Sequence, residues 1–130
     1  MMRFLLAAPL LLALGCATSS TPYAPVANVR YSAMGQNPFW VLNIGDDRIV
    51  LHVAGAPADN VWPRILPVID GNVTWWRFRA GDRTVLIEAR QVLPTACELG
   101  NRRYADFVRV TVGDQHHEGC GGRLVDREPR

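Results

Sequence analysis

The chain has 130 residues, of which 48% are hydrophobic, 20% charged and 8% aromatic, so it can form one small globular domain and not two. Fourteen arginines against twelve acids give a formal net charge of +2, too small an excess for a surface that follows nucleic-acid phosphates. Eleven glycines, nine prolines and four tryptophans favour a turn-rich β protein over a helical bundle, because Gly and Pro break helices.

The amino terminus has the pattern of an export signal. Arg3 precedes an apolar run from Phe4 to Gly15, which is shorter than the roughly 20 residues that a membrane-spanning helix needs. The run ends in Leu12-Ala13-Leu14-Gly15-Cys16, which resembles the lipobox of bacterial lipoproteins. Residues 1–15 are therefore predicted to be a lipoprotein signal peptide, with Cys16 as the lipidated first residue of the mature chain. The alternative is an ordinary signal peptide that happens to end at a cysteine.

The lipobox resemblance implies a location and an attachment. Several acyl chains on Cys16 would hold the protein stably on a membrane, which a single chain does not. In lipoproteins of this type the residue after the cysteine influences sorting. Ala17 stands at this position instead of Asp, which implies the outer membrane of a Gram-negative cell, with the protein facing the periplasm. Residues 16–29 contain Ser, Thr, Pro and Ala without charge until Arg30, and they are predicted to be a flexible tether. Residues 30–130 are predicted to form a single β domain.

The three cysteines fit this location. An odd number would leave one stray thiol in an exported protein, but lipidation of Cys16 removes one. Cys97 and Cys120 then remain, and in an oxidising compartment they are predicted to form a disulfide. The alternative is a pair of reduced structural cysteines.

Strand patterns follow one another from Arg30 onward, with frequent turn signals and no convincing helical periodicity. A hairpin is predicted from 39–44 and 48–53, and an irregular or edge segment from the Pro-rich passage 55–67. The region 94–103, which holds Cys97, is predicted to be a loop or short helical turn. The expected fold is a small antiparallel meander barrel or strongly curved sheet of six to eight strands, with a two-sheet sandwich as the alternative. Further strands are predicted at 73–80, 84–90, 104–112 and 116–125.

Alternation along 73–80 predicts an outward face formed by Trp75, Arg77 and Arg79. An exposed Trp beside arginines can stack on a sugar or anchor a protein, because both residue types supply large desolvated contacts. These three residues are the predicted binding surface. The alternative is that a loop covers Trp75, or that it lies inside a barrel, and that the arginines only contact solvent.

Histidines supply the densest titratable cluster, His116-His117-Glu118. On a strand, His116 and Glu118 face one side and His117 the other, whereas zinc usually needs three or four converging ligands. Only His52 could complete such a site. The cluster is therefore a weak metal candidate, and no metal, cofactor or catalytic residue is predicted. The chain also lacks a Gly-x-Ser-x-Gly nucleophile elbow.

Tyr31-Ser32-Ala33-Met34-Gly35-Gln36-Asn37-Pro38-Phe39-Trp40, then Cys97, Tyr104 and Gly119-Cys120-Gly121-Gly122, resemble a family of Gram-negative envelope lipoproteins. That family opens on Gly-x-Glu-Pro-Phe-Trp, carries a middle cysteine and closes on Gly-Cys-Gly. Asn37 stands here where the family has Glu. The resemblance implies a β-rich fold and an envelope location, and it brings no established activity.

The two motifs have a structural interpretation. Pro38 is expected to hold Asn37 extended, so that Phe39 and Trp40 enter the first strand with the indole in the core. Gly119, Gly121 and Gly122 are expected to adopt positive φ angles that bring Cys120 within bridging distance of Cys97.

The sequence as a whole predicts a non-enzymatic, lipid-anchored envelope module that binds a protein or glycan partner. One alternative is a metal-binding or enzymatic protein that uses His116, His117 and Glu118. Another is a structural factor in envelope integrity. The membrane is an expected partner through the lipid anchor, and nucleic acid is not.

Overall fold

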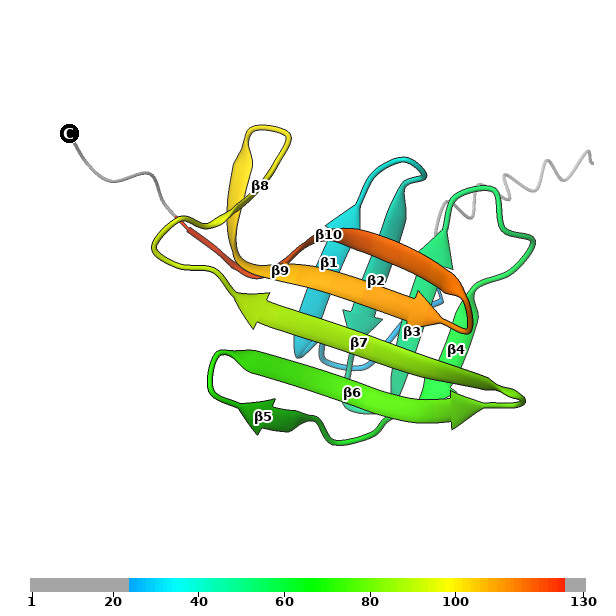
Figure 1. Cartoon of the computed structure of the whole chain (residues 1–130). Helices are drawn as coiled ribbons and strands as arrows, with labels where there is room; N and C mark the ends of the chain where they lie inside the picture. Colours follow the sequence, from blue (N-terminus) through cyan, green and yellow to red (C-terminus); the bar gives the residue numbers. More distant parts are fainter. Residues whose placement is uncertain (1–23, 126–130) are drawn as a thin grey trace, which may run out of the picture.

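The computed structural model describes residues 24–125, so the predicted signal peptide and Cys16 lie outside the described residues (Figure 1). Within 24–125, no helix has the length and apolar character needed to cross a membrane. The described chain forms ten strands: β1 (Tyr31–Gly35), β2 (Trp40–Ile44), β3 (Arg48–Val53), β4 (Asn60–Pro63), β5 (Val68–Asp70), β6 (Val73–Ala80), β7 (Arg83–Gln91), β8 (Cys97–Leu99), β9 (Arg102–Val112) and β10 (Gln115–Leu124).

All ten strands belong to one antiparallel sheet with the order β4-β3-β2-β1-β10-β9-β7-β6-β5, and β8 pairs with β9. The sheet curls strongly into a half-barrel, in which β7, β9 and β10 pass in front of β1 to β4 (Figure 1). The single continuous sheet confirms the curved-sheet prediction and excludes the two-sheet sandwich. The expected six to eight strands were too few. The missed strands are β1, β5 and β8, so Trp40 begins the second strand and not the first. β5 and β8 have three residues each, which is too few to show alternation.

The chain path is also not a simple meander. β1 pairs with β10, with Met34 opposite Cys120, and β7 pairs directly with β9. The predicted loop at 94–103 contains β8, whose Cys97 lies opposite Tyr104 at the start of β9. That prediction was wrong because Gly100, at φ +62°, turns the chain back and lets a very short strand pair locally.

The predicted hairpin of 39–44 and 48–53 is confirmed, and two further predicted strands also pair with each other. β2 and β3 pair with Ile44 opposite Ile49, and β6 and β7 pair from Val73 to Ala80. The Pro-rich passage supplies β4 at one end of the strand order, where Pro63 is tolerated because no further strand requires the N–H donor that proline lacks.

The hydrophobic core fills the concave side of the sheet. Trp62 of β4 and Phe78 of β6 meet edge to face, with ring centroids 5.3 Å apart, so side chains close the open side of the half-barrel. The core cluster consists of Ala33, Trp40, Leu42, Ile44, Ile49, Leu51, Trp62, Trp76, Val85, Ile87, Ala89, Val108, Val110 and Val112.

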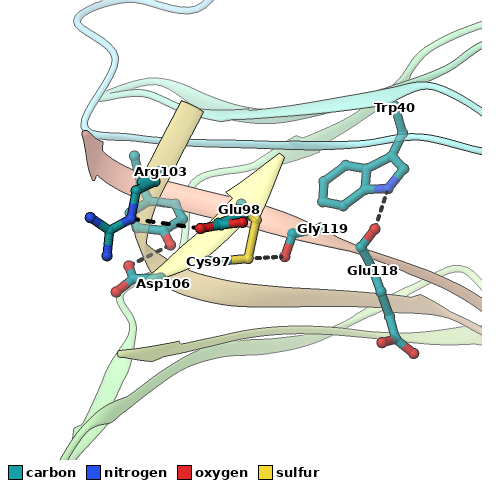
Figure 2. Close-up of a disulfide and its surroundings, with 9 residues drawn as sticks. Trp40, Cys97, Glu98, Arg103, Asp106, Glu118 and Gly119 are labelled. Atoms are coloured by element: carbon teal, nitrogen blue, oxygen red, sulfur yellow. Dashed lines mark hydrogen bonds and ion pairs between the residues drawn. A yellow bond between two sulfur atoms is a disulfide. The ribbon is translucent and has the colours of Figure 1, made fainter. Parts of the chain in front are cut away.

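Asn37 lies in the turn that joins β1 to β2, and its φ of +66° is left-handed instead of extended as expected. The chain must reverse within residues 36–39, and Asn tolerates the left-handed region that such a reversal uses. The core position of Trp40 is confirmed, because its side chain is buried. Its indole N–H donates to the backbone oxygen of Glu118 at 3.2 Å (Figure 2).

The closing glycines serve a different purpose from the one expected. Only Gly122, at φ +78°, has a positive φ. Gly119 and Gly121 are required by close packing, because a Cβ at Gly119 would meet the carbonyl group of Met34 and one at Gly121 would lie 2.7 Å from the Ala33 Cβ. These glycines let β1 and β10 approach each other.

The predicted disulfide between Cys97 and Cys120 is confirmed, with the two Cα atoms 5.6 Å apart (Figure 2). Because β8 pairs with β9 and β9 with β10, the bridge ties the short β8 across β9 to the sheet. It therefore fixes a segment that has few backbone hydrogen bonds of its own.

Residues 24–29, part of the predicted tether, are hydrogen bonded to the sheet. The Ala24 N–H donates to Asp59 Oδ2 at 2.8 Å, and the Ala27 N–H donates to Asp47 Oδ1 at 2.9 Å. Asp59 follows β3 and Asp47 precedes it, so this segment runs along the outer side of β3. Val50 of β3 is buried although it is not part of the core cluster.

Candidate binding surfaces

Trp75, Arg77 and Arg79 all lie on the outer side of β6, as the alternation predicted. Trp75 is half-buried and stands between Val68 of β5 and Glu88 of β7. Arg77 and Arg79 are exposed. We call the surface formed by Trp75, Arg77 and Arg79 the β6 face.

The charges around the β6 face are unevenly paired. In the row across the outer side that contains Trp75, the next three positions are Glu88, Arg109 and Glu118, so opposite charges are neighbours there. Arg77 lies opposite Leu86 instead. Within residues 24–125 neither Arg77 nor Arg79 forms an ion pair, and Arg79 donates only to the backbone oxygen of Asp82 at 3.4 Å. Two guanidinium groups without carboxylate partners therefore follow the partly buried Trp75 along the outer side of β6.

The histidine cluster does not converge on one point. His116 lies on the outer side and its Nδ1 is 3.1 Å from the Thr111 hydroxyl, whereas His117 packs beside Trp40 on the inner side. Burial, with a contribution from His116, lowers the pKa of the His117 imidazole. Glu118 lies opposite Arg109 on the outer side. In the part of the chain that the structure describes, no group of three His, Cys, Asp or Glu side chains could hold a metal ion.

His52 is engaged elsewhere, because its Nδ1 lies 2.7 Å from Asp59 Oδ1. Burial opposes ionisation of Asp59, but the hydrogen bonds from His52 and the Ala24 N–H outweigh it, and the pKa of this carboxyl is lowered. The pair therefore fastens the segment before β1 to the loop before β4.

A second polar pair, Tyr31 and Asp106, was not predicted from the sequence. The Tyr31 hydroxyl donates to Asp106 Oδ2 at 2.7 Å, and the Tyr31 ring lies 5.4 Å from that of Trp76. Burial, and then the bond to Asp106, raises the pKa of Tyr31. The two residues are 75 positions apart, so no local pattern joins them. The available signal was Asp106 itself, an acid on the inward side of a predicted strand.

Tyr31 and Asp106 border a hollow of about 470 Å³ at one end of the half-barrel, which we call the Tyr31 hollow. A hollow of about 580 Å³ at the opposite end is bordered by His117, Arg83 and Val53. Both sizes fall in the range of small-ligand sites.

Comparison of the chain with protein-family models, with curated proteins and with solved structures finds no match. Function is therefore inferred from the residues and their geometry alone.

Proposed function

We propose that the chain is a non-enzymatic binding module that recognises a protein or glycan partner through the β6 face. The observation that carries the proposal is that a partly buried Trp75 shares the outer side of β6 with two guanidinium groups that have no carboxylate partner within the described chain. Trp and Arg are the residues in which binding energy most often concentrates.

The chemistry of the β6 face favours a partner that carries carboxylates. An arginine binds a carboxylate through two parallel hydrogen bonds, and Arg77 and Arg79 lie two residues apart on the same side of one strand. Trp75 adds a flat apolar surface that suits a sugar ring or an apolar side chain. An acidic protein surface or an acidic glycan combines both features.

We also propose that the module works at a membrane surface, through residues 1–15 as a signal peptide and Cys16 as a lipid anchor on the periplasmic side of the outer membrane. The sequence Leu12-Ala13-Leu14-Gly15-Cys16 supports this location. The Cys97–Cys120 bridge is consistent with it, because disulfides persist in oxidising compartments.

Binding through the β6 face predicts that the variant Trp75→Ala/Arg77→Ala loses the partner that the parent retains. When the immobilised full chain is incubated with an envelope extract, the parent should retain one discrete protein or glycan. The variant should retain at least about tenfold less partner, because loss of a central Trp and Arg typically weakens affinity by about tenfold or more. Mass spectrometry and sugar analysis of the retained material measure the difference.

A matched control is Val61→Ala/Arg102→Ala, which removes an exposed apolar residue and an exposed arginine away from the β6 face. This variant should retain as much partner as the parent. Equal retention by the parent and the Trp75→Ala/Arg77→Ala variant would refute the proposed surface.

The anchor predicts that Cys16→Ser abolishes lipid attachment. In cells supplied with labelled palmitate, the parent chain should become labelled and sediment with membranes, and the variant should do neither, because the thiol that accepts the lipid is gone. Cys97→Ser serves as the control, since its cysteine is not the proposed lipid acceptor. Label on the Cys16→Ser chain would contradict the anchor.

A further inference from the structure

The Tyr31 hollow has apolar walls and a closed floor. It is bordered by Ile44 of β2, by Trp76 of β6 and by Ile65, which lies between β4 and β5. Below it, the half-barrel is filled by side chains such as Ile87 and Val108, which are fully buried. A ligand can therefore occupy only the hollow itself, which suits a short apolar group.

One wall of the hollow offers a hydrogen-bond acceptor. Asp106 accepts the Tyr31 hydroxyl at Oδ2, and within residues 24–125 its Oδ1 accepts no hydrogen bond. The closing glycines leave room for this pair, because a Cβ at Gly122 would lie 2.6 Å from Asp106 Oδ2 and one at Gly121 would lie 2.9 Å from the Tyr31 hydroxyl. The motif Gly121-Gly122 thus preserves a carboxylate that can receive an N–H or O–H from a ligand.

The rim of the hollow offers a guanidinium group. Arg30 already binds both carboxylate oxygens of Asp46, at 2.6 and 3.1 Å, and this bond holds the pKa of Asp46 at about 2. Arg64 lies farther from the Asp46 carboxylate, with its Nη1 4.0 Å from Asp46 Oδ1. The same nitrogen donates to the backbone oxygen of Asp46 at 3.4 Å. Because Arg30 occupies Asp46, Arg64 keeps donors for an external anion.

We propose that the Tyr31 hollow binds a small carboxylate that carries an apolar group and an adjacent hydrogen-bond donor, the chemistry of an N-acylated apolar amino acid. The apolar group fills the hollow beside Trp76 and Ile65, the carboxylate pairs with Arg64, and the amide N–H donates to Asp106. Arg30 and Asp46 neutralise each other and Asp106 accepts the Tyr31 hydroxyl, so Arg64 is the charged group of the hollow that keeps donors for an anion. This site is separate from the β6 face and does not depend on it.

Titration of the full chain in detergent with N-acetylleucine tests the proposal. The indole N–H nuclear magnetic resonance signals of the tryptophans are followed, and that of Trp76 should shift saturably. The signal of Trp75, on the outer side of the sheet, should stay in place. N-acetylleucinamide, which lacks the carboxylate, should bind about tenfold more weakly, because it cannot form the charge-assisted bond to Arg64.

Arg64→Gln should weaken N-acetylleucine binding about tenfold, and Arg83→Gln, at the opposite hollow, should leave it unchanged. Equal binding of the acid and the amide, an unaffected Arg64→Gln chain, or no saturable shift of the Trp76 signal would each overturn the proposal. The comparison of acid and amide on the parent chain decides the question even if a variant fails to fold.

Discussion

Replacing Gly119 with alanine should destabilise the domain by about 3 kcal/mol, at the upper end of the usual cost of overpacking a core. The added Cβ would meet the Met34 carbonyl group and lie 2.8 Å from the Cα of Gly35, and backbone atoms cannot rotate away as a side chain can. The pairing of β1 with β10 is the one junction in the strand order between β1–β4 and the strands that follow. Loss of its register would therefore separate the two parts of the half-barrel.

Denaturant-induced unfolding of the Gly119→Ala chain measures this effect as a lower transition midpoint. Gly71→Asn is the matched control, because nothing lies within 4 Å of the added Cβ and asparagine tolerates a φ of +60°. It should unfold close to the parent. If the Gly119→Ala chain also unfolds at the parent midpoint, the close approach of β1 and β10 is not required.

Removal of the disulfide in Cys97→Ser/Cys120→Ser should lower the free energy of unfolding by about 3 kcal/mol in the chain-entropy model. The bridge closes a separation of 23 residues, and opening it restores conformational freedom to the unfolded chain. Denaturant unfolding of the double variant, beside the parent with and without a reducing agent, measures the loss.

The reduced parent should unfold like the double variant, because both lack the same bond. A parent that keeps its full stability in the reducing agent, together with an unchanged double variant, would mean that β8 and its pairing with β9 hold this region without the bridge.

Long alternating segments were predictable from the sequence. The bounds of β6 are those expected, 73–80, because eight residues of alternation distinguish an inward Trp76 from an outward Trp75. The disulfide was predictable because the predicted lipidation of Cys16 leaves Cys97 and Cys120 as a single pair. Both inferences use information that lies within one segment or in a count of one residue type.

Nonlocal pairings could not be predicted in the same way. The junction of β1 with β10 brings Met34 beside Cys120, and the Tyr31 bond to Asp106 follows from it. Neither leaves a periodic signal, because each depends on how the curled sheet closes. Asn37 was mispredicted for a related reason, since the tight reversal between two strands outweighed the preference that a following proline imposes.

The most direct test of partner binding is photo-crosslinking in cells that express the full chain. A photoreactive amino acid replaces Val68, which lies opposite Trp75 and is 52% exposed, or Val61, a control valine on β4 that is 48% exposed. Binding through the β6 face predicts a discrete adduct from position 68, none from position 61, and loss of the adduct in the Trp75→Ala/Arg77→Ala background. No adduct from position 68, or one that persists in that background, would contradict it.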